Sequence, residues 1–293
     1  MSFTLRRRSF IIGSSLLLPI AGLGAGPAFS AENDINRQLA SLEKRTGGRL
    51  GVSVLDTKSN VSFGHRQDER FAMCSTVKAL AAAFVLARVD KGQETLGRRI
   101  DVSKADLHAH SPVAEKHVGD GMTVGELCDA AVTYSDNAAA NLILASFGGP
   151  AGLTAWLRSI GDETTRLDRT EPALNEAKPG DPRDTTTPAA MMRTLGKLLL
   201  EDVLSPSSRD QFAAWLVANR TGDRRLRAGL PTNWTIGEKT GTSGHGEAGD
   251  VGFMRPPKSQ TILASVYIAE APKPVKELEP IFAEVGKLIA GMA

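Results

Sequence analysis

The sequence predicts an α+β fold: an antiparallel sheet built from both chain ends with flanking helices, and an all-helical lobe inserted between those ends. Three observations predict it. Short β-type runs occur near both ends of the chain and hardly anywhere between them. The middle shows helical patterns, and 293 residues suffice for one large domain or two small lobes. We expect an α/β lobe from residues 31–70 and 221–293, a helical lobe from 71–220, and a site in the cleft between them.

The expected strands follow apolar and β-branched runs. Residues 50–55 and 61–63 flank the turn-forming sequence 57–60, which predicts a hairpin. The Pro256-Pro257 pair and the glycine-rich run 241–249 separate later strands. These later strands are expected over residues 234–238, 249–254 and 261–269.

Helices are expected in the middle of the chain and at its end. Residues 72–89 are rich in Ala, Leu and Val. Thr123 and Glu126 form a capping box that opens another helix. Thr187 followed by Pro188 predicts a helix that runs to about residue 200, and a last helix is expected over 278–291.

The first thirty residues predict a cleavable export signal. They combine three arginines (6–8), an apolar run (11–23) and the small-x-small sequence Ala28-Phe29-Ser30. The apolar run is too short for a bilayer-spanning helix, which needs about 20 residues. Twin-arginine export and ordinary secretion fit equally well. The mature chain should begin near Ala31 and act in the periplasm or outside the cell, with no stable membrane anchor.

Composition excludes several classes of protein. The chain is 41% hydrophobic and 23% charged, which excludes a disordered chain or a disulfide scaffold. Removal of the leader arginines leaves 32 basic against 33 acidic residues, so nothing indicates a nucleic-acid partner. We expect a monomer. Although export permits a disulfide, Cys74 lies in an apolar helical run, and we expect Cys74 and Cys128 to be free thiols.

A serine and a lysine three residues apart form the first chemical motif. Ser75 and Lys78 would lie on one helix face, where a lysine of lowered pKa could take the serine proton. The spacing alone is weak, because Ser41 and Lys44 repeat it on an expected solvated helix face.

Two later motifs are also weak when taken singly. Ser135-Asp136-Asn137 falls between two expected helices and could be a plain turn. Lys239-Thr240-Gly241 lies on or just after an expected strand and could be a charged strand end. In this order, however, the three motifs resemble the set found in class A β-lactamases and penicillin-binding proteins.

Further segments make the resemblance to the class A enzymes specific. The sequence Glu171-Pro172-Ala173-Leu174-Asn175 resembles their deacylation segment, and residues 110–117 resemble a loop at the site rim. Arg169 and Asp184 match the pair that closes the family's Ω-shaped loop, here about 169–184. The resemblance covers essentially residues 31–293.

This resemblance implies hydrolysis of penicillins and cephalosporins through a Ser75 acyl-enzyme, with no cofactor and no metal. Backbone N–H groups of Ser75 and Thr242 would form the oxyanion hole. Either Lys78 or Glu171 would be the acylation base, which the family leaves disputed. The other implied roles are a proton relay and carboxylate-binding pair (Ser135, Lys239), a substrate amide contact (Asn137), deacylation (Glu171, Asn175) and further substrate contacts (Thr240, Gly241, Thr242, His110).

The substrate carboxylate also needs a cation, and Arg225 occupies one of two family positions for it; its alternative is a solvated helix-end charge. Cys74, His110, Thr242 and Arg225 together resemble members that hydrolyse carbapenems. Two departures stand against this. Ser243 and Ala82 occupy positions where family members carry the cysteines that would pair with Cys74 and Cys128.

Three rival interpretations remain. A penicillin-binding D,D-peptidase would share Ser75, Lys78 and Lys239, but it would lack the deacylating Glu171. A β-lactam-sensing module would stay acylated. A metal site at His108 and His110 lacks a third ligand cluster.

Overall fold

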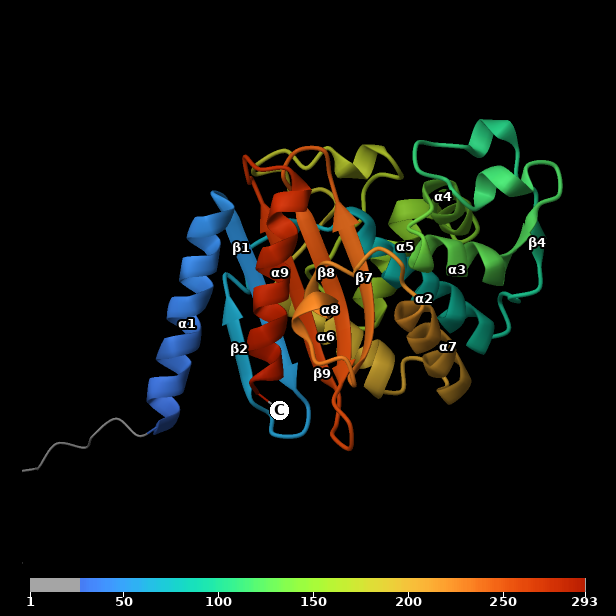
Figure 1. The fold of residues 1–293 in the computed structure, drawn as a ribbon. Coiled ribbons are helices and arrows are strands. Elements are labelled where there is room, and N and C mark those ends of the chain that lie inside the picture. Colours follow the sequence, from blue (N-terminus) through green and yellow to red (C-terminus); the bar gives the residue numbers. More distant parts are fainter. Residues whose placement is uncertain (1–26, 293) are drawn as a thin grey trace, which may run out of the picture.

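In this computed structural model, the structure describes residues 27–292 (Figure 1). The expected export signal lies outside the described residues except for its last residues, which begin helix α1 (Pro27–Thr46). One antiparallel sheet, in the order β2-β1-β9-β8-β7, combines strands from both ends of the chain. The predicted α+β fold is confirmed. The five strands are β1 (Arg49–Asp56), β2 (Ser62–His65), β7 (Thr235–Thr242), β8 (Ala248–Arg255) and β9 (Ile262–Ala269).

The central strand β9 shows how the sheet separates two apolar cores. All eight of its residues are buried, and they alternate between the two faces as the strand period requires. Leu263 and Tyr267 join the core that includes the middle helices. Val266 and Ile268 join a second core with α1 and the C-terminal helix α9 (Val275–Ala290). Figure 1 shows α9 lying across one face of the sheet, with α6 behind it.

The remaining helices lie mostly beside the sheet, towards its β7 edge (Figure 1). Thr123 caps α3 in the predicted capping box, and Thr187 caps α6 with Pro188 at its first position. The helices beside the sheet are α2 (Val77–Asp90), α3 (Val124–Thr133), α4 (Asn137–Ala145), α5 (Gly149–Ser159) and α7 (Pro206–Val217). The helix behind the sheet is α6 (Pro188–Leu200), and α8 (Leu226–Gly229) lies next to α9. Four single-turn 3₁₀ helices accompany them: η1 (Cys74–Thr76), η2 (Lys104–Asp106), η3 (Ala114–His117) and η4 (Ala173–Asn175).

Two small ladders lie outside the main sheet: β3 (Phe71–Ala72) pairs with β6 (Thr185–Thr186), and β4 (Arg99–Ile100) pairs with β5 (Met122–Thr123). The first ladder corrects one expectation. The helix predicted over 72–89 begins only at η1, because Ala72 hydrogen-bonds as a strand residue.

Other local predictions are confirmed or extended. The 57–60 hairpin turn is closed by Asp56, which exchanges backbone hydrogen bonds with Asn60 and Val61 (2.9 Å each). The strand expected at 234–238 continues to Thr242, because β8 pairs with it along its whole length. Cys74 and Cys128 are free and buried. Within the described residues, no single helix is long and apolar enough to cross a membrane, although α4 and α5, bent by 71°, pass that test as a pair.

Candidate active site

Ser75 lies in the strained turn that joins β3 to α2. Cys74, which precedes it, is buried with a φ of 45°, a conformation that a side-chain-bearing residue adopts only when its surroundings impose it. One such restraint is the Met73 N–H, which donates to the Asp184 carbonyl (3.0 Å). The Ser75 hydroxyl donates to Glu171 Oε1 (3.1 Å). A hydroxyl is therefore held against a carboxylate.

Lys78 follows one helical turn later, and oxygen atoms surround its ammonium group. Its Nζ lies 2.9 Å from Glu171 Oε1 and donates to Asn137 Oδ1 (2.5 Å) and the Ser135 carbonyl (2.7 Å). The side chain is 1% exposed. Burial lowers the pKa of Lys78, and the neighbouring Glu171 carboxylate opposes that shift. An amine with a lowered pKa next to a hydroxyl can exchange protons with it.

Ser135 lies between α3 and α4 with a φ of 60° and joins two lysines. Its hydroxyl oxygen is 3.1 Å from Lys239 Nζ and 3.4 Å from Lys78 Nζ. Burial lowers the pKa of Lys239 well below its usual value, and the positive charges of Lys78 and Arg225 lower it further. A hydroxyl between two amines is suited to passing a proton.

Asp136 and Asn137 hold the loop that carries Ser135. The buried Asp136 carboxylate caps α4 and accepts hydrogen bonds from the backbone N–H groups of Val113 and Ala114 (2.9 Å each). Asn137 donates through Nδ2 to the Ala109 carbonyl (2.7 Å). The next residue of that loop is His110, whose Nε2 lies 3.0 Å from the Tyr134 carbonyl.

Glu171 is fixed through both its main chain and its side chain. Asn141 of α4 donates to the Glu171 carbonyl and accepts from the Glu171 N–H, at 2.9 Å each. Asn175 Nδ2 donates to Glu171 Oε2 (2.5 Å). The carboxylate is buried yet reaches Ser75 and Asn175 together. It could hold a water molecule between them, because each oxygen retains free lone pairs.

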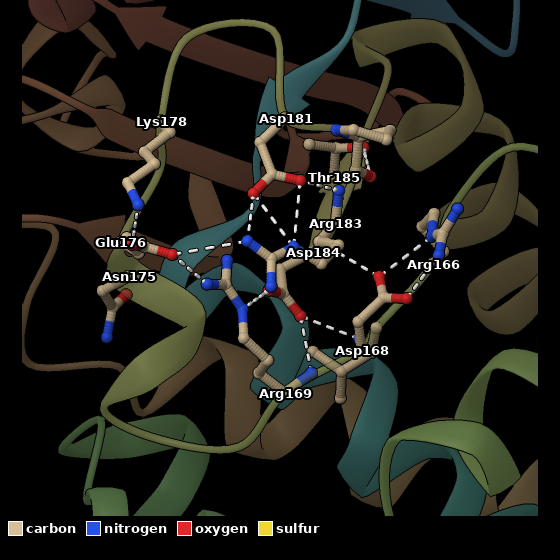
Figure 2. Close-up of polar contacts among 12 residues, drawn as sticks. Arg166, Asp168, Arg169, Asn175, Glu176, Lys178, Asp181, Arg183, Asp184 and Thr185 are labelled. Atoms are coloured by element: carbon tan, nitrogen blue, oxygen red, sulfur yellow. Dashed lines mark hydrogen bonds and ion pairs between the residues drawn. The ribbon is translucent and has the colours of Figure 1, made fainter.

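Ion pairs close the Ω-shaped loop that contains Glu171 (Figure 2). Arg169 Nε pairs with the buried Asp184 (2.6 Å), and Arg169 also reaches Glu176. Asp184 accepts backbone hydrogen bonds from Asp168 (2.8 Å) and Arg169 (2.9 Å). Lys178 pairs with Glu176 as well (2.5 Å). The loop ends are thereby tied together beside η4, which carries Asn175.

The end of β7 forms the opposite wall of the site. Gly241 packs so closely on the turn before Ser75 that a Cβ there would lie 2.6 Å from the Met73 carbonyl oxygen. This contact requires glycine. β7 is the edge strand of the sheet, and Thr240 and Thr242 flank Gly241 on it. The free edge of the strand therefore faces the nucleophile.

Arg225 lies behind this wall and is buried, not a solvated helix-end charge. It is 4% exposed. Its guanidinium donates to the carbonyls of Gly241 (2.8 Å) and Gly249 (2.5 Å) and to Thr242 Oγ1 (2.6 Å). Arg225 thereby connects the end of β7 to the start of β8 and brings a positive charge close to the site.

A cavity of about 320 Å³ opens above these groups. Lys78, Glu171 and Lys239 lie beneath its surface and Arg225 behind it, so the structure brings the expected site residues together. The cavity is lined by Ser75, His110, Ser135, Asn137, Asn175, Thr221, Thr240, Gly241 and Thr242.

Sequence reasoning missed two of the residues around this cavity. Thr221 lines it and shares a hydroxyl hydrogen bond with Thr240. No sequence signal distinguished Thr221. Asn141, which clamps Glu171, carried one: it is the single polar side chain between Ala138 and Ala145 in an apolar helix.

Comparisons with known proteins find one matching family and several similar chains. The profile of the β-lactamase enzyme family matches residues 33–292. β-Lactamase CTX-M-8 of Citrobacter amalonaticus is 43% identical over 267 residues, which are 91% of this chain and 92% of that protein. β-Lactamase Toho-1 of Escherichia coli is 45% identical over 257 residues, 88% of each chain.

Solved structures are similar as well. The last common ancestor of Gram-negative bacteria β-lactamase class A (GNCA4) superposes with a TM-score of 0.87 at 62% identity. The match covers 88% of this chain and 98% of that one.

Proposed function

The chain belongs to the class A β-lactamases, which hydrolyse the β-lactam amide, and we propose that Ser75 is its nucleophile and Glu171 its deacylating base. The observation that carries the proposal is the contact between Ser75 Oγ and Glu171 Oε1 (3.1 Å), with Asn175 on the other carboxylate oxygen. A serine hydroxyl is a weak nucleophile until a neighbouring base takes its proton.

In the acylation step, the Ser75 hydroxyl attacks the lactam carbonyl. Lys78 and Glu171 both lie close enough to assist the proton transfer, and we assign the acylation base to this pair rather than to one member. The N–H groups of Ser75 and Thr242 receive the developing oxyanion, and donors of this kind contribute about 2.7–4 kcal/mol each to the transition state. The close packing of β7 on the turn before Ser75 supports this assignment.

Ser135 passes a proton to the leaving lactam nitrogen in this proposal. Its contacts with Lys78 and Lys239 support the role, because either lysine can give the Ser135 hydroxyl a new proton once it has donated its own. Thr240 and Thr242 bind the substrate carboxylate at the end of β7. The positive charges of Lys239, beneath the cavity, and Arg225, behind β7, attract it there. Asn137 and His110 contact the substrate amide and the opposite rim.

In the deacylation step, a water molecule between Glu171 and Asn175 attacks the acyl-enzyme. Glu171 takes the water proton, and the ester bond to Ser75 Oγ breaks. The clamp on the Glu171 main chain and the closed Ω-shaped loop support this step, because a general base must be held within hydrogen-bond reach of its water.

We further propose that penicillins and cephalosporins are substrates and that carbapenems are turned over. The Arg225–Thr242 contact places a cation and a hydroxyl at the carboxylate end of the site, and all three substrate classes carry that carboxylate. The combination of Cys74, His110, Thr242 and Arg225 supports the carbapenem assignment. We infer action outside the cytoplasm, as a monomer, from the expected leader and the composition.

Turnover of benzylpenicillin, a cephalosporin and imipenem by purified protein, with Ser75→Ala as the control, tests these proposals. We expect all three to be hydrolysed by the wild type and none by the variant. If imipenem acylates the protein only once, the carbapenem assignment is wrong. If the variant hydrolyses the penicillin, the assignment of the nucleophile is wrong.

A further inference from the structure

Two carboxyl groups are buried against each other on the face of the sheet that faces away from Ser75. Glu238 of β7 pairs in register with Gly252, and Asp250 of β8 pairs with Thr240. Glu238 and Asp250 are therefore diagonal neighbours on one face of adjacent strands. Both are 0% exposed. Their side chains lie on the side of α8 and α9, opposite to the Lys239 side chain.

The hydrogen bonds of this pair leave two carboxyl oxygens without a donor. Glu238 Oε1 accepts from Arg227 Nε (2.8 Å), and Asp250 Oδ2 accepts from the Leu226 N–H (3.1 Å). The remaining oxygens, Glu238 Oε2 and Asp250 Oδ1, are buried and receive no other donor. They belong to neighbouring carboxyl groups that are both fully buried. Because a carboxylate has no hydrogen to donate, a proton on one of the two groups would supply the donor that these oxygens lack.

Burial supports the same conclusion. It raises the pKa of Glu238, and it raises that of Asp250 well above its usual value, where the neighbouring Glu238 adds to the shift. Two adjacent buried carboxylates cannot both ionise without strong repulsion. Arg227 of α8 is the nearby cation that keeps one of the two ionised, while Asp223 adds a further negative charge.

The single charge that remains lies near two arginines. Arg227 pairs directly with Glu238 but is partly exposed, so solvent also compensates its charge, whereas Arg225 is buried. Among the described residues, Arg225 forms no ion pair: its guanidinium donates to two carbonyls and one hydroxyl, and its buried Nε has no partner. Asp250 lies beside it: Arg225 donates to the carbonyl of Gly249, which precedes Asp250, and Leu226, which follows Arg225, donates to the Asp250 carboxyl group (3.1 Å). Glu279 of α9 is a further acid nearby. A buried guanidinium requires a compensating negative charge.

We propose that Glu238 and Asp250 share one proton and act as a monoanionic positioning pair, whose single charge holds Arg225 at the ends of β7 and β8. The inference rests on the proposed function, in which Arg225 attracts the substrate carboxylate. One charge suits this position. A neutral pair would leave the buried Arg225 unbalanced, and a doubly charged pair would push the two strands apart.

Amide substitutions separate the proton from the charge. In Glu238→Gln or Asp250→Asn, the new amide donates the hydrogen bond that the shared proton supplied, and one negative charge remains. The double variant removes the charge. Glu279→Gln is the matched control, because it removes a nearby acid outside the pair. Arg225→Ala measures the contribution of Arg225 itself.

The first readout is the pH dependence of unfolding. A raised pKa means that the folded wild type keeps a proton that the unfolded chain has released, so its unfolding free energy falls as pH rises above the usual carboxyl range. Across about pH 6 to 8, we expect the unfolding free energy of each single variant to depend on pH by one proton less than that of the wild type. Glu279→Gln should keep the wild-type pH dependence. Equal slopes in the wild type and Asp250→Asn would overturn the shared proton.

The second readout is benzylpenicillin turnover at neutral pH. We expect a rise of about tenfold in KM for the double variant and for Arg225→Ala, the loss of one charge-assisted contact, with smaller changes in the single variants. An unchanged KM in the double variant, with KM raised in Arg225→Ala, would refute the link between pair and arginine. An unchanged KM in Arg225→Ala would refute the proposed function of Arg225. The pH dependence of the unfolding free energy would still test whether Glu238 and Asp250 share a proton.

Discussion

Asn141→Ala should slow deacylation more than its effect on folding explains. The substitution deletes the two hydrogen bonds that hold the main chain of Glu171, each 2.9 Å long. At about 1 kcal/mol net per bond, the unfolding free energy should fall by about 2 kcal/mol, which corresponds to a melting temperature lower by about 4–8 °C. Because a catalytic group misplaced by about 1 Å can cost 100-fold in rate, we expect deacylation to fall by about 10- to 100-fold.

The chain offers a matched control for this variant. Thr154 of α5 makes the same reciprocal pair of bonds with the main chain of Leu167, also 2.9 Å each. Thr154→Ala should therefore lower the melting temperature by a similar amount and leave deacylation unchanged. Stopped-flow measurement of acyl-enzyme decay, together with thermal unfolding, compares the two. Equal deacylation rates in both variants would refute the role assigned to Asn141.

Two further changes test the packing and the electrostatics. Gly241→Ala would place a Cβ 2.6 Å from the Met73 carbonyl oxygen; we expect a loss of about 1–3 kcal/mol in stability and at least a tenfold lower kcat/KM, and unchanged turnover would contradict the proposed contact. The pKa of Glu43 is lowered from 4.5 to about 2. Burial alone would raise this pKa, but hydrogen bonds, led by the one from Arg66, lower it. The stability that this shift contributes is present above about pH 4.5 and is lost as pH falls towards 2. Arg66→Ala should therefore destabilise the protein by about 1 kcal/mol at pH 7 and by less at pH 3 in urea unfolding; a larger difference at pH 3 would contradict the sign.

The sequence predicted the parts of this protein that depend on local patterns. The hairpin at 57–60 and the caps at Thr123 and Thr187 follow from turn and capping chemistry within a few residues, and all three are confirmed. The order of the three motifs identified the family. The ladder at Ala72 escaped prediction, because its partner strand lies more than a hundred residues away.

What could not be predicted depends on contacts between distant segments. In the sequence, the adjacent charged residues Glu238 and Lys239 look like a solvated strand end. Only the register of β7 with β8 shows that Glu238 lies next to Asp250 in the interior. The burial of Arg225 likewise follows from the meeting of two strand ends. Asn141 could have been singled out, because an amide in an otherwise apolar helix must find a partner.

The most direct test of the central claim is intact mass spectrometry of Glu171→Ala during reaction with benzylpenicillin. The wild type should hydrolyse the drug and show no lasting adduct. The variant should accumulate one covalent adduct that carries the whole penicillin mass, on the peptide containing Ser75, and should release it slowly. A variant that turns over at the wild-type rate would contradict the assignment of Glu171 to deacylation, and a wild type that stays acylated would contradict the proposed deacylation mechanism.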